Sequence, residues 1–180
     1  MDKNKPIIVN GEEISVNSQK FKLVTNPNAS FEDYDWTEEF VEDMLYVAEY
    51  EPDNEWMSDP EILNNLGIVY SEAVGVERNI KKAIMYFGRA VALGEDLARS
   101  NLADIYRKGW LYGIPVDHKK AFELYKACHL PYAFYRVGEY YETGRAGIVD
   151  IEQAKKNYCV AYKAGHGLAR KKLQTFDFLH

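Results

Sequence analysis

Histidine has the widest chemical range of the residue types in this chain, because it can bind a metal or move a proton near neutral pH. The four histidines are His118, His129, His166 and His180. Each is expected in a loop or at a helix end. None lies four residues from another histidine, a cysteine or a paired carboxylate suited to a metal. We therefore expect solvated side chains or helix-end cations, and no metal site.

Cysteines, paired acidic residues and glycines were the other candidates for chemistry. Cys128 and Cys159 have no close partner at metal-ligand spacing, so both are expected to pack as small apolar side chains, Cys128 buried and Cys159 more exposed. Sequence neighbours such as Glu42-Asp43 do not face each other on a helix. The stretch from Gly109 to Gly113 lacks the spacing and the Lys-Ser/Thr of a phosphate loop. The sequence predicts no enzyme and no cofactor.

The charge balance bounds the possible partners. The 180 residues carry 22 basic and 28 acidic side chains, a net charge of −6, and 47% of them are hydrophobic. The hydrophobic fraction suffices for a folded core. A nucleic-acid binder needs a basic stripe, so we expect no nucleic acid and favour a basic protein partner. No run of residues suggests secretion or a membrane span, and we expect a cytoplasmic protein.

One spaced pattern occurs three times: Leu66-Gly67-x-x-Tyr70, Leu102-Ala103-x-x-Tyr106 and Val137-Gly138-x-x-Tyr141. The copies follow each other at about 35 residues, a period typical of solenoids built from helix pairs. A helix pair of this kind buries its apolar face only by stacking on its neighbours. The stack leaves an extended surface, which usually binds other proteins.

Start signals mark the helices of each repeat. Pro60 and Pro131 suit the first position of a helix, and Gly94-Glu95-Asp96 precedes the first helix of the second repeat. The N-cap residues expected for the second helices are Asn79, Asp117 and Asp150. A last helix, from Leu168 to about Phe178, is expected to cap the end of the stack.

The first 57 residues differ from the repeats. Asn10-Gly11 between β-branched residues, with Ile14 and Val16 at alternate positions, predicts a β-hairpin; a leader with chance apolar content is the alternative. Thr37 to Tyr50 predicts an amphipathic helix that shields the first full repeat. The predicted domains are residues 1–30, a hairpin-like segment; 31–57, a capping helix and linker; and 58–180, the repeats with a C-terminal capping helix.

These residues resemble the Sel1-like repeat (SLR) family, which is related to the tetratricopeptide repeat. The third copy matches the family pattern at Ala133, Val137-Gly138, Tyr141, Gly144, Gly147-Ile148, Asp150, Ala154, Tyr158 and Ala161. The first copy has Asn79 for the usual aspartate, and the second has Ala103 for the glycine. The resemblance covers about Pro60 to Ala169. It implies a mostly α-helical, right-handed solenoid of antiparallel helix pairs, with about three repeats, that acts as a scaffold without catalysis.

Positions that differ between the copies are where we expect recognition. In related solenoids the first helices line the concave side; an ordinary solvated face is the alternative for any single residue. The predicted partner-binding residues are Asn65, Ile68, Glu72, Asn101, Asp104, Lys108, Trp110, Tyr112, Arg136 and Glu139. Trp110 and Tyr112 belong to a loop two residues longer than its counterparts. We expect the next repeat to cover this loop, and a partner is the alternative.

The sequence therefore predicts a non-catalytic module that binds a protein through its concave repeat surface. The most specific hypothesis is a bacterial immunity-type protein that neutralises a toxin or effector. The chain resembles short stand-alone proteins of the SLR family that have such roles, and an acidic surface suits a basic nuclease. An adaptor or signalling scaffold is the first alternative. An enzyme with its site in the N-terminal segment is the second.

Overall fold

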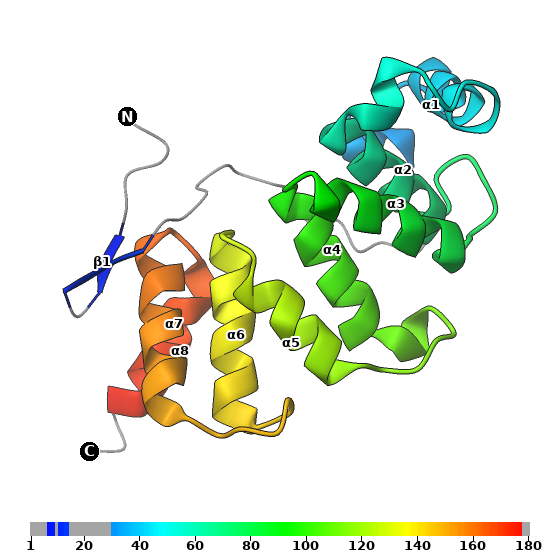
Figure 1. The fold of residues 1–180 in the computed structure, drawn as a ribbon. Helices are drawn as coiled ribbons and strands as arrows, with labels where there is room; N and C mark the ends of the chain where they lie inside the picture. Colours follow the sequence, from blue (N-terminus) through cyan, green and yellow to red (C-terminus); the bar gives the residue numbers. More distant parts are fainter. Residues whose placement is uncertain (1–6, 10, 15–29, 178–180) are drawn as a thin grey trace. The chain divides into compact units, whose positions relative to one another are not determined.

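The computed structural model describes residues 7–9, 11–14 and 30–177, and these residues are mostly helical, as predicted (Figure 1). The elements are β1 (Ile7–Val9), β2 (Glu12–Ile14), η1 (Phe31–Tyr34), α1 (Glu38–Tyr50), η2 (Glu55–Ser58), α2 (Pro60–Glu72), α3 (Ile80–Ala92), α4 (Asp96–Arg107), η3 (Gly109–Leu111), α5 (His118–Lys126), α6 (Pro131–Thr143), α7 (Ile151–Lys163) and α8 (Gly167–Asp177). Asn10, Val16, Phe178 and His180, which entered the expectations above, lie outside the described residues.

Capping side chains determine where the helices begin. Asn79, Asp117 and Asp150 each accept a hydrogen bond from the backbone N–H three residues later, at 3.0, 2.9 and 2.9 Å. Asp59 caps α2, whose first residue is Pro60. Thr37 caps α1 through the N–H of Phe40 at 3.1 Å. These contacts satisfy backbone donors that would otherwise lack a partner, and those of Asn79, Asp117 and Asp150 confirm the predicted N-caps.

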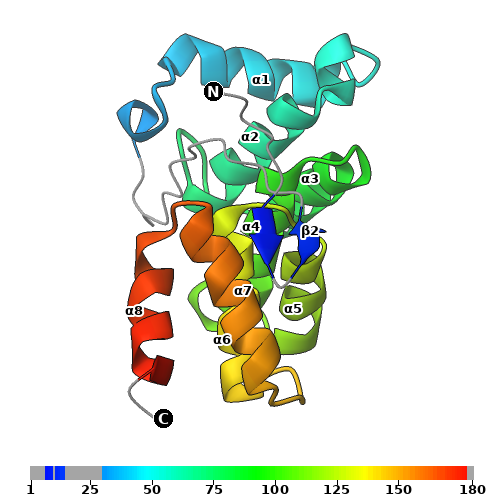
Figure 2. The same cartoon turned by 90° about the vertical axis from the view of Figure 1, so that its left-hand side faces the viewer.

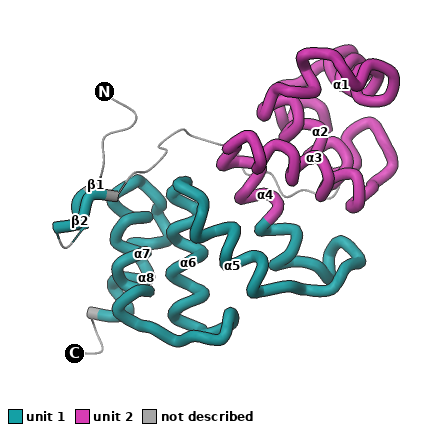
Figure 3. The backbone as a smooth tube through the Cα atoms, viewed as in Figure 1, with its two compact units in different colours: residues 1–20, 103–180 teal, residues 21–102 magenta. Residues whose placement is uncertain are grey.

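The chain divides into two compact units within α4 (Figure 3). Unit 2 comprises residues 21–102, and unit 1 comprises residues 1–20 and 103–180. Each is described by itself below. The domain boundaries drawn from the sequence at residues 30 and 57 stay a prediction.

In unit 2, a glycine lets α2 lie directly against an aromatic residue of α3. A Cβ on Gly67 would sit 2.5 Å from the ring of Phe87, a distance that real side chains do not reach. Leu66 and Phe87 are both fully buried. On the other side, α1 contacts α2 and buries Val41 and Met44, as expected of a helix that shields the first repeat.

In unit 1, α6 and α7 form a pair of the same kind. A Cβ on Gly138 would sit 2.7 Å from the ring of Tyr158, and α8 packs along α7 to close the stack. Tyr158 is fully buried, and Ala154 and Ala161 on either side of it are buried as well. The pairing of a small residue with an aromatic residue thus recurs in both units.

The N-terminal strands form the predicted hairpin. β1 and β2 are antiparallel, Val9 pairs with Glu12, and Gly11 in the turn has a φ of +82°, a conformation that glycine adopts without strain. The hairpin belongs to unit 1, where β1 contacts α7 (Figures 1 and 2). Val9 is buried against Val160, and the Lys163 ammonium donates to the Ile8 carbonyl at 2.8 Å.

Candidate protein-binding surface

The first-helix residues of unit 2 differ in how far they reach solvent. Asn65, Ile68 and Asn101 are half-buried. The Asn101 amide donates to the Asn64 side chain at 3.1 Å, which joins α4 to α2. Glu72 is buried, with only 6% of its surface exposed. Three of the four predicted residues therefore reach the surface of this unit, and Glu72 does not.

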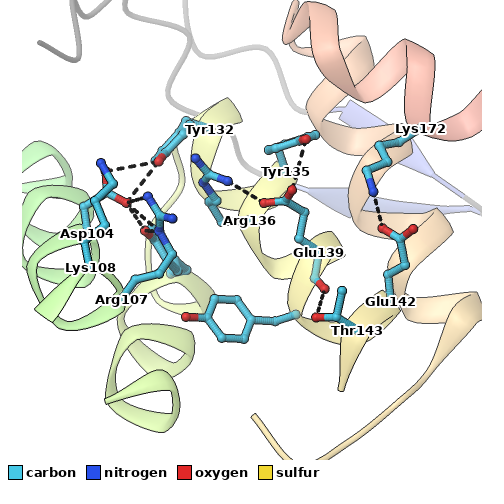
Figure 4. Close-up of polar contacts among 12 residues, drawn as sticks. Asp104, Arg107, Lys108, Tyr132, Tyr135, Arg136, Glu139, Glu142, Thr143 and Lys172 are labelled. Carbon is cyan, nitrogen blue, oxygen red and sulfur yellow. Dashed lines mark hydrogen bonds and ion pairs between the residues drawn. The ribbon is translucent and has the colours of Figure 1, made fainter. Parts of the chain in front are cut away.

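In unit 1, the predicted contact residue Asp104 is the centre of a buried polar cluster (Figure 4). It is 5% exposed. Its carboxylate accepts hydrogen bonds from Arg107 at 2.9 and 3.0 Å, from Lys108 at 3.2 Å and from the Tyr132 hydroxyl at 3.0 Å. The Tyr125 hydroxyl donates to it as well. The cluster joins α4, α5 and α6.

The electrostatics of the cluster favour the charged carboxylate. Burial by itself raises the pKa of Asp104, but the neighbouring Arg107 and Lys108 outweigh burial and hold that pKa below its usual range. Burial and the negative charge of Asp104 raise the pKa of Tyr125, which stays protonated as a donor. An acceptor with this many partners stabilises the packing of three helices. Asp104 is accordingly a packing residue and not part of an open stripe.

Two other predicted residues, Arg136 and Glu139, pair with each other on α6. Their side chains are half-buried and joined at 2.5 Å. The Arg136 guanidinium lies 4.7 Å from the centre of the Tyr132 ring, and the Tyr135 hydroxyl donates to Glu139 at 3.2 Å. The Arg136 Nε is buried and has no hydrogen-bond partner among the residues that the structure describes. Since both charges already have a partner, this face presents a paired and partly covered surface.

The most exposed of the predicted residues is Trp110. The loop closes on itself through the Gly109 carbonyl, which accepts from the N–H groups of Tyr112 and Ile114, both at 3.0 Å. Tyr112 is half-buried, whereas Trp110 is 74% exposed. The expectation that the next repeat covers this loop is therefore wrong for Trp110. Lys108, two residues earlier, is half-buried because it binds Asp104.

Two histidines and one cysteine, side chains that could do chemistry, pack against other residues of the fold. The His166 ring stacks on Tyr135 with centroids 4.5 Å apart, and His118 Nδ1 lies 3.1 Å from the Tyr140 hydroxyl. Both histidines are half-buried, so they are not the solvated residues we expected; burial, followed by nearby arginines, lowers their pKa values. Cys128 is buried, as predicted.

Within the described ranges, no group of three or more His, Cys, Asp or Glu side chains could hold a metal ion. Over the same residues, no helix is long and apolar enough to cross a bilayer.

The family follows from the sequence match to the repeats. A family model described as Sel1 repeat matches residues 60–95, 97–127 and 131–166, more than half of the chain. The chain belongs to the Sel1 repeat family. Sel1 repeat proteins generally mediate protein–protein interactions and are typically non-catalytic scaffolds. The helices described above are thus the first and second helices of three Sel1 repeats, with α1 before them and α8 after them.

Solved structures agree with this assignment. A Sel1 repeat protein from Oxalobacter formigenes is 27% identical, with a TM-score of 0.62 over 76% of this chain and 98% of that one. A protective antigen from uropathogenic Escherichia coli strains, which has an SLR fold, is 20% identical, with a TM-score of 0.63 over 76% of this chain and 29% of that one. At that identity the second match shows the fold alone. No curated protein matches the sequence.

Sequence reasoning missed Arg107, Tyr125 and Tyr132, the partners of Asp104. One signal was available, because Arg107 and Lys108 follow Asp104 by three and four residues and so share its helix face. Nothing in the sequence showed that Tyr125 and Tyr132, from two other helices, would complete the cluster.

Proposed function

We propose that this Sel1 repeat protein binds another protein through the residues of its first helices and their loops that reach the surface. Trp110 carries the proposal. An indole that is 74% exposed has a hydrophobic cost in water, and tryptophan is among the residues that supply most of the binding energy at protein interfaces. The other proposed contact residues in unit 1 are Lys108, Tyr112, Arg136 and Glu139, and those in unit 2 are Asn65, Ile68 and Asn101.

The partner that we propose is a basic protein, a bacterial toxin or effector that the chain neutralises by covering it. The net charge of −6 supports this choice, since charge complementarity accelerates association and disfavours acidic competitors. An adaptor would use the same surface without neutralising what it binds.

The first test is capture of the partner, followed by one substitution. The protein is used as bait in an extract of its own source, and the captured protein is identified by mass spectrometry. Trp110→Ala should then weaken binding by about 2 kcal/mol, roughly 30-fold, with little effect on thermal stability. Tyr162→Ala is the matched control, because Tyr162 is 45% exposed on α7 and lies outside the proposed surface. Equal affinity of Trp110→Ala and wild type would remove the loop from the interface.

A growth assay separates neutralisation from scaffolding. The captured protein is expressed in a bacterial host with and without this chain. Toxicity that the chain relieves, and that the Trp110→Ala chain relieves less well, supports the immunity hypothesis. A captured protein without toxicity favours the adaptor.

A further inference from the structure

The solvent face of α1 has a composition unlike that of the other helix faces described above. Six of its exposed residues are here called the α1 stripe: Glu39, Glu42, Asp43, Tyr46, Glu49 and Tyr50. Their spacing of three and four residues places them along one side of the helix. Val41 and Met44, on the other side, are buried. The stripe therefore faces away from the buried side of α1 and is exposed to solvent.

Acidic and basic residues are strongly segregated along the sequence, and the α1 stripe lies in the acidic part of the chain. Residues 30–77 contain 15 acidic and no basic side chains, whereas the rest of the chain contains 22 basic and 13 acidic ones. The net charge of −6 thus hides an acidic stretch of −15. A potential of this sign attracts cations over roughly the Debye length, about 10 Å at 0.1 M salt.

The carboxylates of the stripe have few ion-pair partners among the residues that the structure describes. Among the described residues, Glu39, Glu42 and Asp43 have no basic side chain within ion-pair distance. Glu49 has Lys82 at 3.9 Å, and the two side chains are 61% and 42% exposed. Arg136 and Glu139 of unit 1, by contrast, are already paired with each other. Three exposed carboxylates without an ion-pair partner among the described residues therefore share one face of α1.

Two exposed aromatic rings accompany this charge. Tyr46 is 56% exposed and Tyr50 is 69% exposed, with ring centroids 5.1 Å apart. Aromatic faces attract cations, and arginine can stack on a tyrosine while its N–H groups bind a carboxylate. Tyr46 lies three or four residues from Glu42, Asp43 and Glu49, which puts rings and carboxylates within reach of one side chain.

We propose that the α1 stripe is the docking site for an arginine- and lysine-rich segment of the protein partner. The proposal rests on the proposed function and adds to it the place where the basic part of the partner binds. Charge complementarity selects this occupant, because nucleic acid and anionic lipid would be repelled. The two tyrosines favour arginine over lysine, since the planar guanidinium stacks on a ring.

The test uses a synthetic 12-residue peptide of alternating arginine and alanine, titrated into the isotopically labelled full chain at low salt and followed by NMR. Peptides with lysine or glutamate in place of arginine are the comparison. We expect amide shifts concentrated at residues 38–50, weaker binding of the lysine peptide and no binding of the glutamate peptide. Glu42→Gln/Asp43→Asn should weaken binding about fivefold or more, with a smaller dependence on salt. Tyr46→Ala/Tyr50→Ala should remove the preference for arginine over lysine.

The control has the same change in net charge at a different place. Glu123→Gln/Glu152→Gln neutralises two exposed carboxylates on α5 and α7, so it should leave the affinity for the arginine peptide within about twofold. An equal loss in both double variants, or shifts spread over the whole chain, would show a general charge effect and overturn the docking site.

The outcome for the captured partner separates this proposal from the proposed function. A partner that binds Glu42→Gln/Asp43→Asn as tightly as wild type, but loses affinity for Trp110→Ala, leaves the function standing and removes the α1 stripe from it. Self-association of the wild-type chain in analytical ultracentrifugation, abolished by the same double variant, would assign the stripe to a second copy and also overturn the proposal.

Discussion

Asp104→Asn separates a packing role from a binding role most sharply. The asparagine keeps the shape of the side chain and can still accept from the two tyrosines, but it removes the negative charge that binds Arg107 and Lys108. Those two cationic side chains are only 17% and 19% exposed. Breaking a buried ion pair by removing one partner costs about 3–5 kcal/mol. Because Arg107 and Lys108 keep some contact with water, we expect the lower end, about 3 kcal/mol.

Thermal unfolding measures this loss directly. For a chain of this length, about 3 kcal/mol corresponds to a fall in Tm of about 6–12 °C. Glu123→Gln is the matched control, because Glu123 faces Lys126 at 3.6 Å on an exposed helix face, where ion pairs contribute little. A change below about 1 kcal/mol in Asp104→Asn, together with lost partner binding, would refute the packing role and return Asp104 to the interface.

The pH dependence gives a second, independent measurement. The pKa of Asp104 in the folded chain is lowered, below an unfolded value of about 3.9. The ionised carboxylate therefore stabilises the fold above the unfolded pKa, and this contribution is lost as the pH falls through the folded pKa. The difference in unfolding free energy between wild type and Asp104→Asn should be full at pH 7 and shrink below about pH 4. A constant difference from pH 7 to pH 3 would contradict the assignment.

Three further substitutions test the packing of the two units. Gly67→Ala should cost about 1–3 kcal/mol in urea denaturation, because its Cβ would meet the buried Phe87; an unchanged midpoint would contradict the close approach of α2 and α3. Ala73→Gly should stabilise by about 0.5–1 kcal/mol, since Ala73 ends α2 at a φ of +62°; destabilisation would argue against that conformation. Val9→Asp should release the hairpin and speed the labelling of Cys159, which packs beside Val160; an unchanged labelling rate would show that the hairpin does not cover it.

Local patterns in the sequence predicted the repeats, the helix starts and the hairpin. Each of these depends on residues close in sequence: a cap and the first turn, or a two-residue turn between strands. The docking of the hairpin on α7 was not predictable in this way. Lys163 binds the Ile8 carbonyl across 155 residues of sequence, and no local pattern specifies such a contact.

The surface was harder to predict than the fold. Helix periodicity shows which side chains point away from their own helix, but it does not show which other helices they contact. Asp104 follows the outward spacing of its helix, yet Tyr125 and Tyr132 from α5 and α6 cover it. The prediction for Trp110 failed in the opposite direction. We expected a neighbour to cover its loop, but the hydrogen bonds to the Gly109 carbonyl close the loop without burying the indole.

Charges that are already paired contribute little to the recognition of a partner, because binding must first break or share their existing contacts. This applies to Asp104 and to the pair of Arg136 with Glu139. The first helices of unit 1 can therefore bind a partner through shape complementarity and aromatic contacts more than through unpaired charges. In unit 2, the α1 carboxylates of Glu39, Glu42 and Asp43 are exposed and have no ion-pair partner among the described residues. We therefore expect the salt dependence of association to follow Glu42 and Asp43, and the rate of dissociation to follow Trp110.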